Sequence, residues 1–330
     1  MSEEEFVEEP LRKLKSVSPE LASVLKDKGF YTLESLAIES PHVLFDRVGE
    51  RVGFNLDKAR QIVREARDSL KIEIMTAAEL YEEEISRKCY STGSKVLDEL
   101  LGGGVHEQEI TEFCGVYESG KTEICLTTAL MAAQHAVSTL FFDTEGSFSA
   151  KRLYEMAKAR GLNPQETIPL VSYAKVYGSE HFVFLLENAH KPIRERNIKI
   201  IVVDSLVSPF RAEYLGRELL APRQQLINRC LRMLINYARA YHIAVVTTEQ
   251  VLASPVAYTY NVRPEVQTPP VGGYVVGHLV GNRVYLTIGP GTRRVATLIG
   301  SSYLPRGSVE FAISRDGIID VKEETKGQGP

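Results

Sequence analysis

The chain has 330 residues, of which 44% are hydrophobic and 25% charged, and its mean hydropathy is −0.12. This composition allows a globular protein with a sizeable core, as one large domain plus a small one or as two medium domains. The sequence contains no apolar run of the roughly 18 residues that span a bilayer, and its acidic start is unlike a signal peptide. The net charge of −4 excludes an overall basic nucleic-acid-binding surface, so any basic face must be local. Four cysteines without C-x-x-C spacing favour reduced thiols in a cytoplasmic protein over disulfides or a zinc site.

Residues 1–73 are predicted to form a small domain of short helices. Ser18 can cap a helix that begins at Pro19, and Gly29 can end it. The stretch NLDKARQIVREARDSLKIE is the clearest amphipathic helix, because one of its faces is apolar and the other charged. That apolar face consists of Leu56, Ala59, Ile62, Val63 and Ala66. The charged residues 74–88 are predicted to be an exposed linker.

Residues 89–330 are predicted to form an α/β domain. The β-rich runs EITEFCG, STLFFDTEG, KIIVVDS and IAVVTTEQV alternate with helices such as APRQQLINRCLRMLINYARAY. Buried strands that alternate with helices are typical of a mainly parallel sheet. Near the C-terminus, GNRVYLTIGPGTRRVATLIGSS and SVEFAISRDGIIDV are predicted to be antiparallel strands joined by glycine-containing turns.

The stretch GVYESGKTE, residues 115–123, has the spacing Gly-x-x-x-x-Gly-Lys-Thr between a predicted strand and a predicted helix. Backbone N–H groups of such a loop and the helix N-terminus attract phosphate. We therefore expect Lys121 to reach the β- and γ-phosphates of ATP and the Thr122 hydroxyl to bind Mg²⁺. The alternative is a glycine-rich turn that binds nothing. The candidate nucleotide-binding residues here are Gly115, Glu118, Ser119, Gly120, Lys121, Thr122 and Glu123.

Polar residues end three further predicted strands. Asp204 ends KIIVVD and is predicted to hold the water shell of Mg²⁺, although it could instead cap the next helix. Glu145 follows another strand and could orient or deprotonate the attacking water. Gln250 ends VVTTEQ, where its side chain could sense the γ-phosphate. Since ligands of open α/β folds bind at the carboxyl ends of the strands, these residues predict an ATPase site.

These segments together resemble the RadA recombinases of archaea and their eukaryotic relatives, which belong to the RecA superfamily. The resemblance extends from about residue 11 to residue 321. It is most specific in STGSKVLDELLGGGV, GVYESGKTE, FFDTEGSF, VVDSLVSPFRAEYLGR and VGGYVVGH. It implies a RecA-type ATPase core, a helix-hairpin-helix N-terminal domain, and an ATP-dependent filament on single-stranded DNA that exchanges strands with a homologous duplex. It also implies that ATP lies between neighbouring protomers.

The resemblance assigns roles to individual residues. Arg152 matches the arginine that stacks on the adenine, whereas His278 and Pro305 match residues near the ATP of a neighbouring protomer. FRAEYLGR matches the first DNA-binding loop, where arginines can contact phosphate and Tyr214 can stack on a base. Residues 254–273 match the second loop, which ends in a glycine pair. The candidate DNA-binding residues are Arg211, Tyr214, Arg217, Arg223, Arg263, Gly272 and Gly273.

The chain departs from the family pattern at several places. The polymerisation motif Phe-x-x-Ala reads IMTA, with Ile74 and Ala77 at the anchor positions. Replacing Phe by Ile weakens an apolar anchor by ~1–2 kcal/mol. Ser301 stands where the ATP cap has an aspartate, and Glu249 stands where the family has an asparagine beside Gln250. The loop QHAVST is short.

The first hairpin of the N-terminal domain, SVSPE, lacks the family's glycines, whereas the second retains Gly49 and Gly53. This domain could therefore contact DNA backbone or serve only for packing or partner binding. The departures also leave two versions of the function: a recombinase that assembles into its own filament or ring, or a paralog that assists another RadA-type recombinase. The DNA loops disfavour a signalling or clock ATPase. The intact Lys121, Thr122 and Glu145 disfavour a nonhydrolysing subunit.

Overall fold

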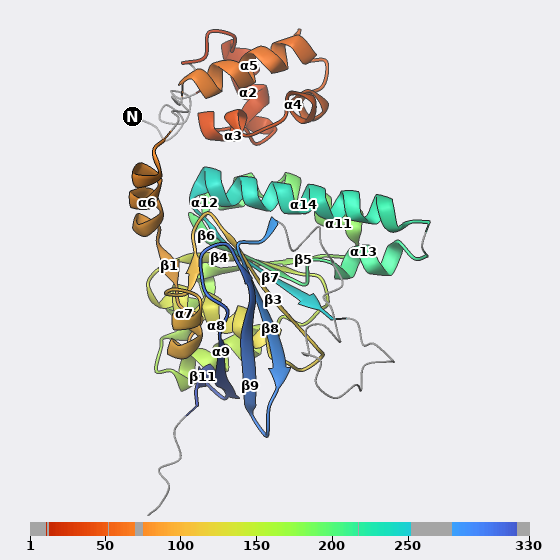
Figure 1. Ribbon diagram of the computed structural model, residues 1–330. Helices are drawn as coiled ribbons and strands as arrows, with labels where there is room; N and C mark the ends of the chain where they lie inside the picture. Colours follow the sequence, from red (N-terminus) through yellow and green to blue (C-terminus); the bar gives the residue numbers. More distant parts are fainter. Residues whose placement is uncertain are drawn as a thin grey trace, which may run out of the picture.

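The computed structural model describes residues 11–321, with the exception of residues 12, 52, 70–74, 217 and 252–278 (Figure 1). A helical N-terminal unit is followed by a single connecting helix and then by an α/β core. The mainly parallel α/β core preceded by a small helical region is the fold that the sequence predicts. In the described part of the chain, no helix is long and apolar enough to cross a membrane.

The N-terminal unit is built from short helices around its own apolar core. The Ser18 side chain accepts a hydrogen bond from the N–H of Leu21, while Thr32 and Ser35 form a reciprocal capping box. The predicted apolar face of the longest helix is buried, apart from the partly exposed Leu56. The helices are α2 (Pro19–Asp27), α3 (Leu33–Ala37), α4 (Pro41–Val48) and α5 (Leu56–Ser69).

The predicted linker contains a helix, α6 (Ala77–Ser86), which buries none of its side chains. Thr76 and Glu79 form a capping box at its start. These local hydrogen bonds stabilise α6 although none of its side chains is buried. A small antiparallel sheet follows, formed by β1 (Cys89–Tyr90) and β2 (Val105–His106), with α7 (Lys95–Leu100) between its strands.

A nine-stranded sheet forms the centre of the core, in the order β11-β10-β9-β8-β3-β7-β6-β4-β5. The strands from β8 to β5 in this order pair in parallel, whereas β8, β9, β10 and β11 pair antiparallel, as the sequence predicts for the C-terminal runs. The strands are β3 (Ile110–Gly115), β4 (Ser138–Asp143), β5 (Val171–Lys175), β6 (Ile198–Asp204), β7 (Ala244–Gln250), β8 (Asn282–Ile288), β9 (Arg293–Ser301), β10 (Ser308–Ser314) and β11 (Gly317–Asp320).

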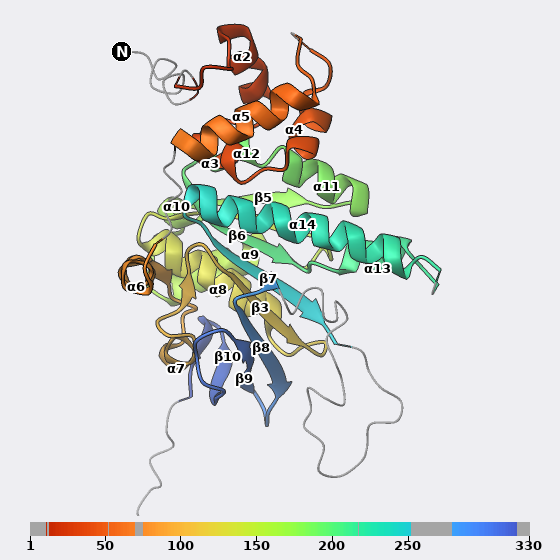
Figure 2. The same cartoon turned by 45° about the horizontal axis from the view of Figure 1, so that its top comes forward.

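Helices cover both faces of this sheet and enclose two apolar cores (Figures 1 and 2). Phe141 packs in the core beneath α8 and α9, and its neighbour Phe142 packs in the core beneath α11 and α14, because side chains alternate along a strand. The helices are α8 (Lys121–Gln134), α9 (Ala150–Ala159), α10 (Pro164–Thr167), the 3₁₀ helix η1 (Ile168–Leu170), α11 (Ser179–Glu187), α12 (His190–Glu195), α13 (Ser208–Glu213) and α14 (Leu220–Tyr241).

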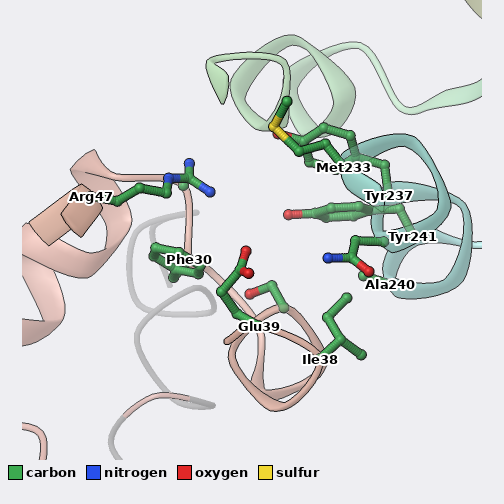
Figure 3. A pocket seen from close by; sticks show the side chains of 11 residues that line it. Phe30, Ile38, Glu39, Arg47, Met233, Tyr237, Ala240 and Tyr241 are labelled. Atoms are coloured by element: carbon green, nitrogen blue, oxygen red, sulfur yellow. The ribbon is translucent and has the colours of Figure 1, made fainter. Parts of the chain in front are cut away.

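The N-terminal unit packs on the α14 side of the core (Figure 2). The Arg47 guanidinium donates to the Glu187 carbonyl at 3.0 Å, and the Arg194 guanidinium lies 4.0 Å from the ring centre of Tyr31. Figure 3 shows Arg47 and neighbouring side chains facing Tyr237 and other residues of α14 across a pocket. Its volume of about 30 Å³ is room for a water molecule and not for a nucleotide.

Candidate active site

The loop after β3 is shaped by two glycines. A Cβ atom at Gly115 would lie 2.6 Å from the Ser119 hydroxyl oxygen and 2.7 Å from the Leu286 carbonyl oxygen. Gly120 has φ +100° at the N-cap of α8, and a Cβ there would lie 2.9 Å from Ile313 Cδ1. Close packing therefore requires glycine at both positions, and the left-handed backbone requires it also at Gly120. A tight loop that ends at a helix N-terminus fits a phosphate group.

Lys121 keeps its ammonium group inside this loop. Its Nζ donates to the carbonyls of Gly115 at 2.9 Å and Val116 at 2.8 Å. Burial lowers the pKa of Lys121, and the nearby carboxylates of Asp204 and Glu145 oppose that shift. These carboxylates and the loop carbonyls thus hold a partly desolvated cation where the loop can present it to phosphate oxygens.

Two other candidates in this loop, Glu118 and Ser119, differ in their contacts. Glu118 has φ +62°, and its carbonyl accepts from Nε of Arg294 at 3.1 Å. Ser119 is fully buried, and among the described residues its hydroxyl has no hydrogen-bond partner. The Ser119 hydroxyl is therefore a free polar group within the loop.

Asp204, at the end of β6, is 2% exposed and accepts three hydroxyl hydrogen bonds. Thr122 donates to it at 2.6 Å, Ser147 donates at 2.8 Å, and Thr248 also donates. Burial raises the pKa of Asp204, the three hydrogen bonds lower it, and the negative charge of Glu145 raises it further. The Asp204 carboxylate and the Thr122 hydroxyl thus lie side by side as oxygen donors.

These two oxygen donors fit Mg²⁺, which in nucleotide sites binds one or two protein ligands and completes its shell with phosphates and water. Within the described ranges, no group of three His, Cys, Asp or Glu side chains could hold a metal ion by itself. A magnesium ion bound by Thr122 and Asp204 would therefore need further ligands from the nucleotide or water.

Glu145 lies where β4, β6 and β7 end beside one another. Ser205 Oγ donates to Glu145 Oε1 at 2.8 Å, and Gln250 Nε2 donates to Oε1 at 3.1 Å and to Oε2 at 3.2 Å. Ser205 is itself held, since its N–H donates to the Thr144 hydroxyl at 2.7 Å. Glu145 is exposed, so its carboxylate is oriented and also accessible to water.

Sequence reasoning did not select several residues that shape this site. The Asp143 carboxylate accepts from the N–H groups of Gly146 at 2.8 Å and Ser147 at 3.0 Å, which folds the loop that carries Glu145. Ser147 and Thr248 bind Asp204, as described above. These three residues could have been selected from the sequence because they lie at the predicted strand ends, Asp143 and Ser147 within FFDTEGSF and Thr248 within VVTTEQ.

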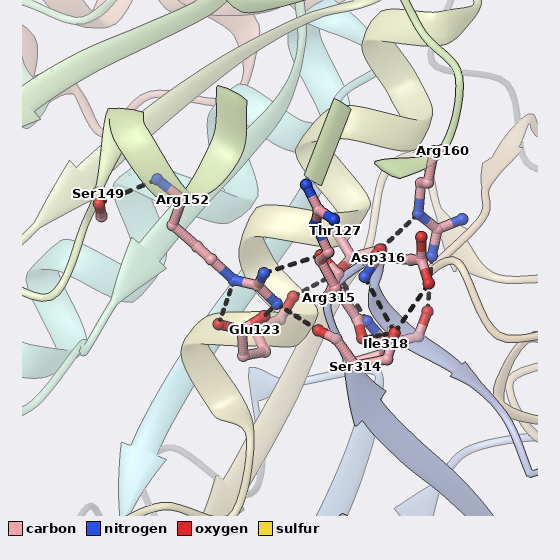
Figure 4. Close-up of polar contacts among 10 residues, drawn as sticks. Glu123, Thr127, Ser149, Arg152, Arg160, Ser314, Arg315, Asp316 and Ile318 are labelled. Carbon is pink, nitrogen blue, oxygen red and sulfur yellow. Dashed lines mark hydrogen bonds and ion pairs between the residues drawn. The ribbon is translucent and has the colours of Figure 1, made fainter. Parts of the chain in front are cut away.

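Arg152 links α8, α9 and the β10–β11 turn (Figure 4). Its Nε and Nη2 donate to the Glu123 carboxylate at 3.0 and 2.8 Å, and its Nη2 and Nη1 donate to the carbonyls of Ser314 at 2.6 Å and Arg315 at 2.8 Å. Hydrogen bonds of a guanidinium lie in its plane, which leaves its faces for stacking. The arrangement is compatible with the predicted adenine contact, and it gives Glu123 a partner in Arg152.

Three of the candidate DNA-binding residues fall within the described chain. The helix α13 begins four residues after Asp204 and carries the exposed Arg211, and Tyr214 follows its last residue. Arg223 lies near the start of α14, is partly buried, and has an Nε without a hydrogen-bond partner among the described residues. The remaining candidates outside the described residues are Arg217, Arg263, Gly272, Gly273, His278 and the motif residue Ile74.

Ser301 lies far from the P-loop, residues 115–123, along the strands of its own chain. Ser301 pairs with Asn282, which pairs with Thr111 near the start of β3, whereas the P-loop follows the end of β3 at Gly115. Thr111 and Gly115 are four residues apart along β3, which corresponds to roughly 13 Å. Pro305 lies in the connection between β9 and β10. Ala77, of the predicted motif, is the exposed first residue of α6.

Comparison with known proteins identifies relatives over almost the whole chain. The profile of the Rad51 family matches residues 85–321. The "DNA repair and recombination protein RadA" of Metallosphaera sedula is 38% identical over 320 residues, which cover 95% of this chain and 96% of that protein. The protein of the same name from Aeropyrum pernix is 38% identical over 93% of this chain and 95% of its own length, and that from Ignicoccus hospitalis is 36% identical over 94% and 95%. The chain belongs to the Rad51 family, which is the family that its motifs predict.

Proposed function

We propose that this protein is a DNA-dependent ATPase and recombinase, which assembles on single-stranded DNA and pairs it with a homologous duplex. The observation that carries the proposal is the convergence of Lys121, Asp204, Glu145 and Gln250 at the carboxyl ends of adjacent strands. The likeness to three proteins named for DNA repair and recombination supports it, because the alignments cover nearly the full length of each.

In this proposal the P-loop binds ATP and the neighbouring carboxylates serve its hydrolysis to ADP and phosphate. The loop N–H groups and Lys121 bind the phosphates. Thr122 and Asp204 hold Mg²⁺, which neutralises phosphate charge. Glu145, oriented by Ser205 and Gln250, positions a water molecule and accepts its proton.

The DNA segments would respond to the nucleotide through short connections. Only three residues separate Asp204 from α13, which carries Arg211. Residues 252–278 begin two positions after Gln250 and contain Arg263 and the Gly272–Gly273 pair. ATP would act as a clamp that stabilises contacts between protomers and so orders these DNA segments, and hydrolysis would release them. Strand exchange itself breaks no covalent bond.

A neighbouring protomer would complete the ATP site. The resemblance to RadA recombinases supports this, because it matches Pro305 and His278 to residues near the ATP of a neighbouring protomer. We therefore assign Pro305 and His278 to the nucleotide of the adjacent copy, and Arg152 to the adenine of its own site. In this proposal residues 1–73 form the helix-hairpin-helix domain, residues 74–88 the linker with the polymerisation motif, and residues 89–330 the ATPase core of a cytoplasmic protein.

A second candidate function is that of a paralog that assists another RadA-type recombinase. The observation that favours it is the replacement of the aromatic anchor of the polymerisation motif by Ile74, together with Ser301 at the ATP cap. In that case the motif would dock on a different recombinase, and the purified protein would form no long filaments.

Electron microscopy with single-stranded DNA and a nonhydrolysable ATP analogue separates the two functions. Long filaments of the wild type support the recombinase, whereas monomers or small closed oligomers contradict it. Ile74→Glu should break the filaments, because a carboxylate enters an apolar pocket only at a cost of several kcal/mol. Met75→Glu is the matched control, since it adds the same charge at the next residue, outside the two anchor positions, and should leave filaments intact.

A further inference from the structure

A cluster of charged side chains is buried inside the central sheet, on the face opposite to α8. Arg283 of β8 reaches Glu112 of β3 and Glu249 of β7: its Nε donates to the Glu112 carboxylate, and its Nη2 donates to Glu249 Oε2 at 3.2 Å. The side chains of Glu112, Glu249 and Arg283 are 0%, 1% and 13% exposed. Because β3 pairs with β7 on one side and with β8 on the other, the cluster ties three adjacent strands together.

The charges in this cluster can balance without solvent. Burial and the negative charge of Glu112 raise the pKa of Glu249. Burial lowers the pKa of Arg283, but the negative charge and hydrogen bond of Glu112 outweigh this, and the pKa of Arg283 is raised. These shifts favour a neutral Glu249 beside the Arg283–Glu112 ion pair. A protonated carboxyl group can both donate and accept hydrogen bonds, so Glu249 can keep its place between the other two groups.

The position of Glu249 connects the cluster with the active site. Adjacent residues on a strand point to opposite faces, so Glu249 enters the cluster while Gln250 points to the P-loop side and donates to Glu145. Gln250 is also the last β7 residue that pairs with β3, opposite Gly115. Since strand ends are weakly held, an anchor one residue earlier controls how the Gln250 backbone is oriented.

We propose that Glu249 and Arg283 are positioning residues that hold the end of β7, so that Gln250 keeps the Glu145 carboxylate in place. This inference rests on the proposed ATPase activity. Neither Glu249 nor Arg283 touches the reacting atoms, so both act only through Gln250.

Steady-state ATP hydrolysis with saturating single-stranded DNA tests the proposal. Glu249→Ala should lower kcat about tenfold, less than the 10²–10⁴ of a general base, because the Glu145 carboxylate is displaced but not removed. KM for ATP should stay within about twofold, because the P-loop is untouched. Glu249→Gln should restore the rate to within about twofold of wild type, since its neutral amide can still bond Arg283. Thr247→Val, at a fully buried position on the same face of β7, is the matched control and should leave both parameters unchanged.

A double-mutant cycle distinguishes positioning from general structural damage. If Glu249 acts through Gln250, Glu249→Ala should cause no further loss of kcat in a Gln250→Ala background. A tenfold loss in both backgrounds would overturn the proposal, as would a wild-type rate in the Glu249→Ala single variant.

Hydrogen–deuterium exchange gives a readout that does not depend on activity. Glu249→Ala should accelerate amide exchange at residues 248–251 and leave residues 244–246 unchanged, whereas Glu249→Gln should change neither. Unchanged exchange at residues 248–251 would overturn the positioning role even if the protein is an active recombinase. A wild type without DNA-stimulated ATP hydrolysis would contradict the proposed function, and the exchange measurement would still decide whether the cluster holds β7.

Discussion

Replacing Glu145 by glutamine tests the assignment of the general base directly. The carboxylate is held by Ser205 Oγ at 2.8 Å and by Gln250 Nε2 at 3.1 Å, and both donors bind the same oxygen, Oε1. A glutamine at position 145 can place its carbonyl oxygen there and keep both hydrogen bonds. Its amide nitrogen would then replace Oε2 and lose only the longer 3.2 Å contact with Gln250. The substitution therefore preserves the geometry and removes the basic group.

Because the substitution removes the base and keeps its hydrogen bonds, the expected loss of rate is the contribution of a general base alone. A positioned general base contributes about 10²–10⁴ to a rate. Since each factor of ten corresponds to ~1.4 kcal/mol, Glu145→Gln should raise the barrier by about 3–5 kcal/mol. ATP affinity should change little, because Lys121 and the loop N–H groups are unaltered.

Two measurements check this expectation together. Phosphate release at saturating ATP and single-stranded DNA gives kcat, and titration with a fluorescent ATP analogue gives affinity. Ser205→Ala serves as a control that removes one orienting donor and leaves the carboxylate, so its loss of rate should be much smaller. Turnover within about threefold of wild type in Glu145→Gln, below the smallest effect expected of a general base, would remove Glu145 from its role.

Three further predictions concern the phosphate site, the DNA segment and the packing of the N-terminal unit. Lys121→Ala should abolish nucleotide binding, because the phosphates lose their main cationic partner; calorimetric titration with ATP checks this. Arg211→Ala should weaken binding to single-stranded DNA and flatten its salt dependence, whereas Tyr214→Ala should weaken binding at an unchanged salt slope; identical slopes for both variants and wild type would show that α13 does not contact phosphates. Burial lowers the pKa of His190 to about 4, below its ordinary 6.5, so between these values the unfolded chain binds the proton more readily and the free energy of unfolding rises with pH. His190→Gln should therefore lessen the loss of stability between pH 7 and pH 5 by up to about 2 kcal/mol in urea titrations, and an unaltered pH dependence would contradict the assignment.

The sequence by itself determined the α/β class, the P-loop and the polar residues at the strand ends. These features are local: apolar runs, caps and the glycine spacing each depend on residues within one element and its neighbours. The helix predicted after the P-loop is present as α8, Lys121–Gln134, for this reason. The capping box of Thr76 and Glu79 is also a local feature, so the sequence could have predicted α6, although the segment was expected to be only an exposed linker.

Only the tertiary structure decided which of these residues meet. Glu145 and Gln250 are 105 residues apart in the chain, and Arg283 and Glu112 are 171 apart. Their contacts depend on the sheet order β8-β3-β7-β6-β4, in which only β6 and β7 are also consecutive strands of the chain. Strand pairing of this kind is set by packing of the whole core and by the crossover helices, and no single segment specifies it. That is why the sequence identified the catalytic candidates one by one, while the buried Glu249 anchor became visible only once β3, β7 and β8 were placed side by side.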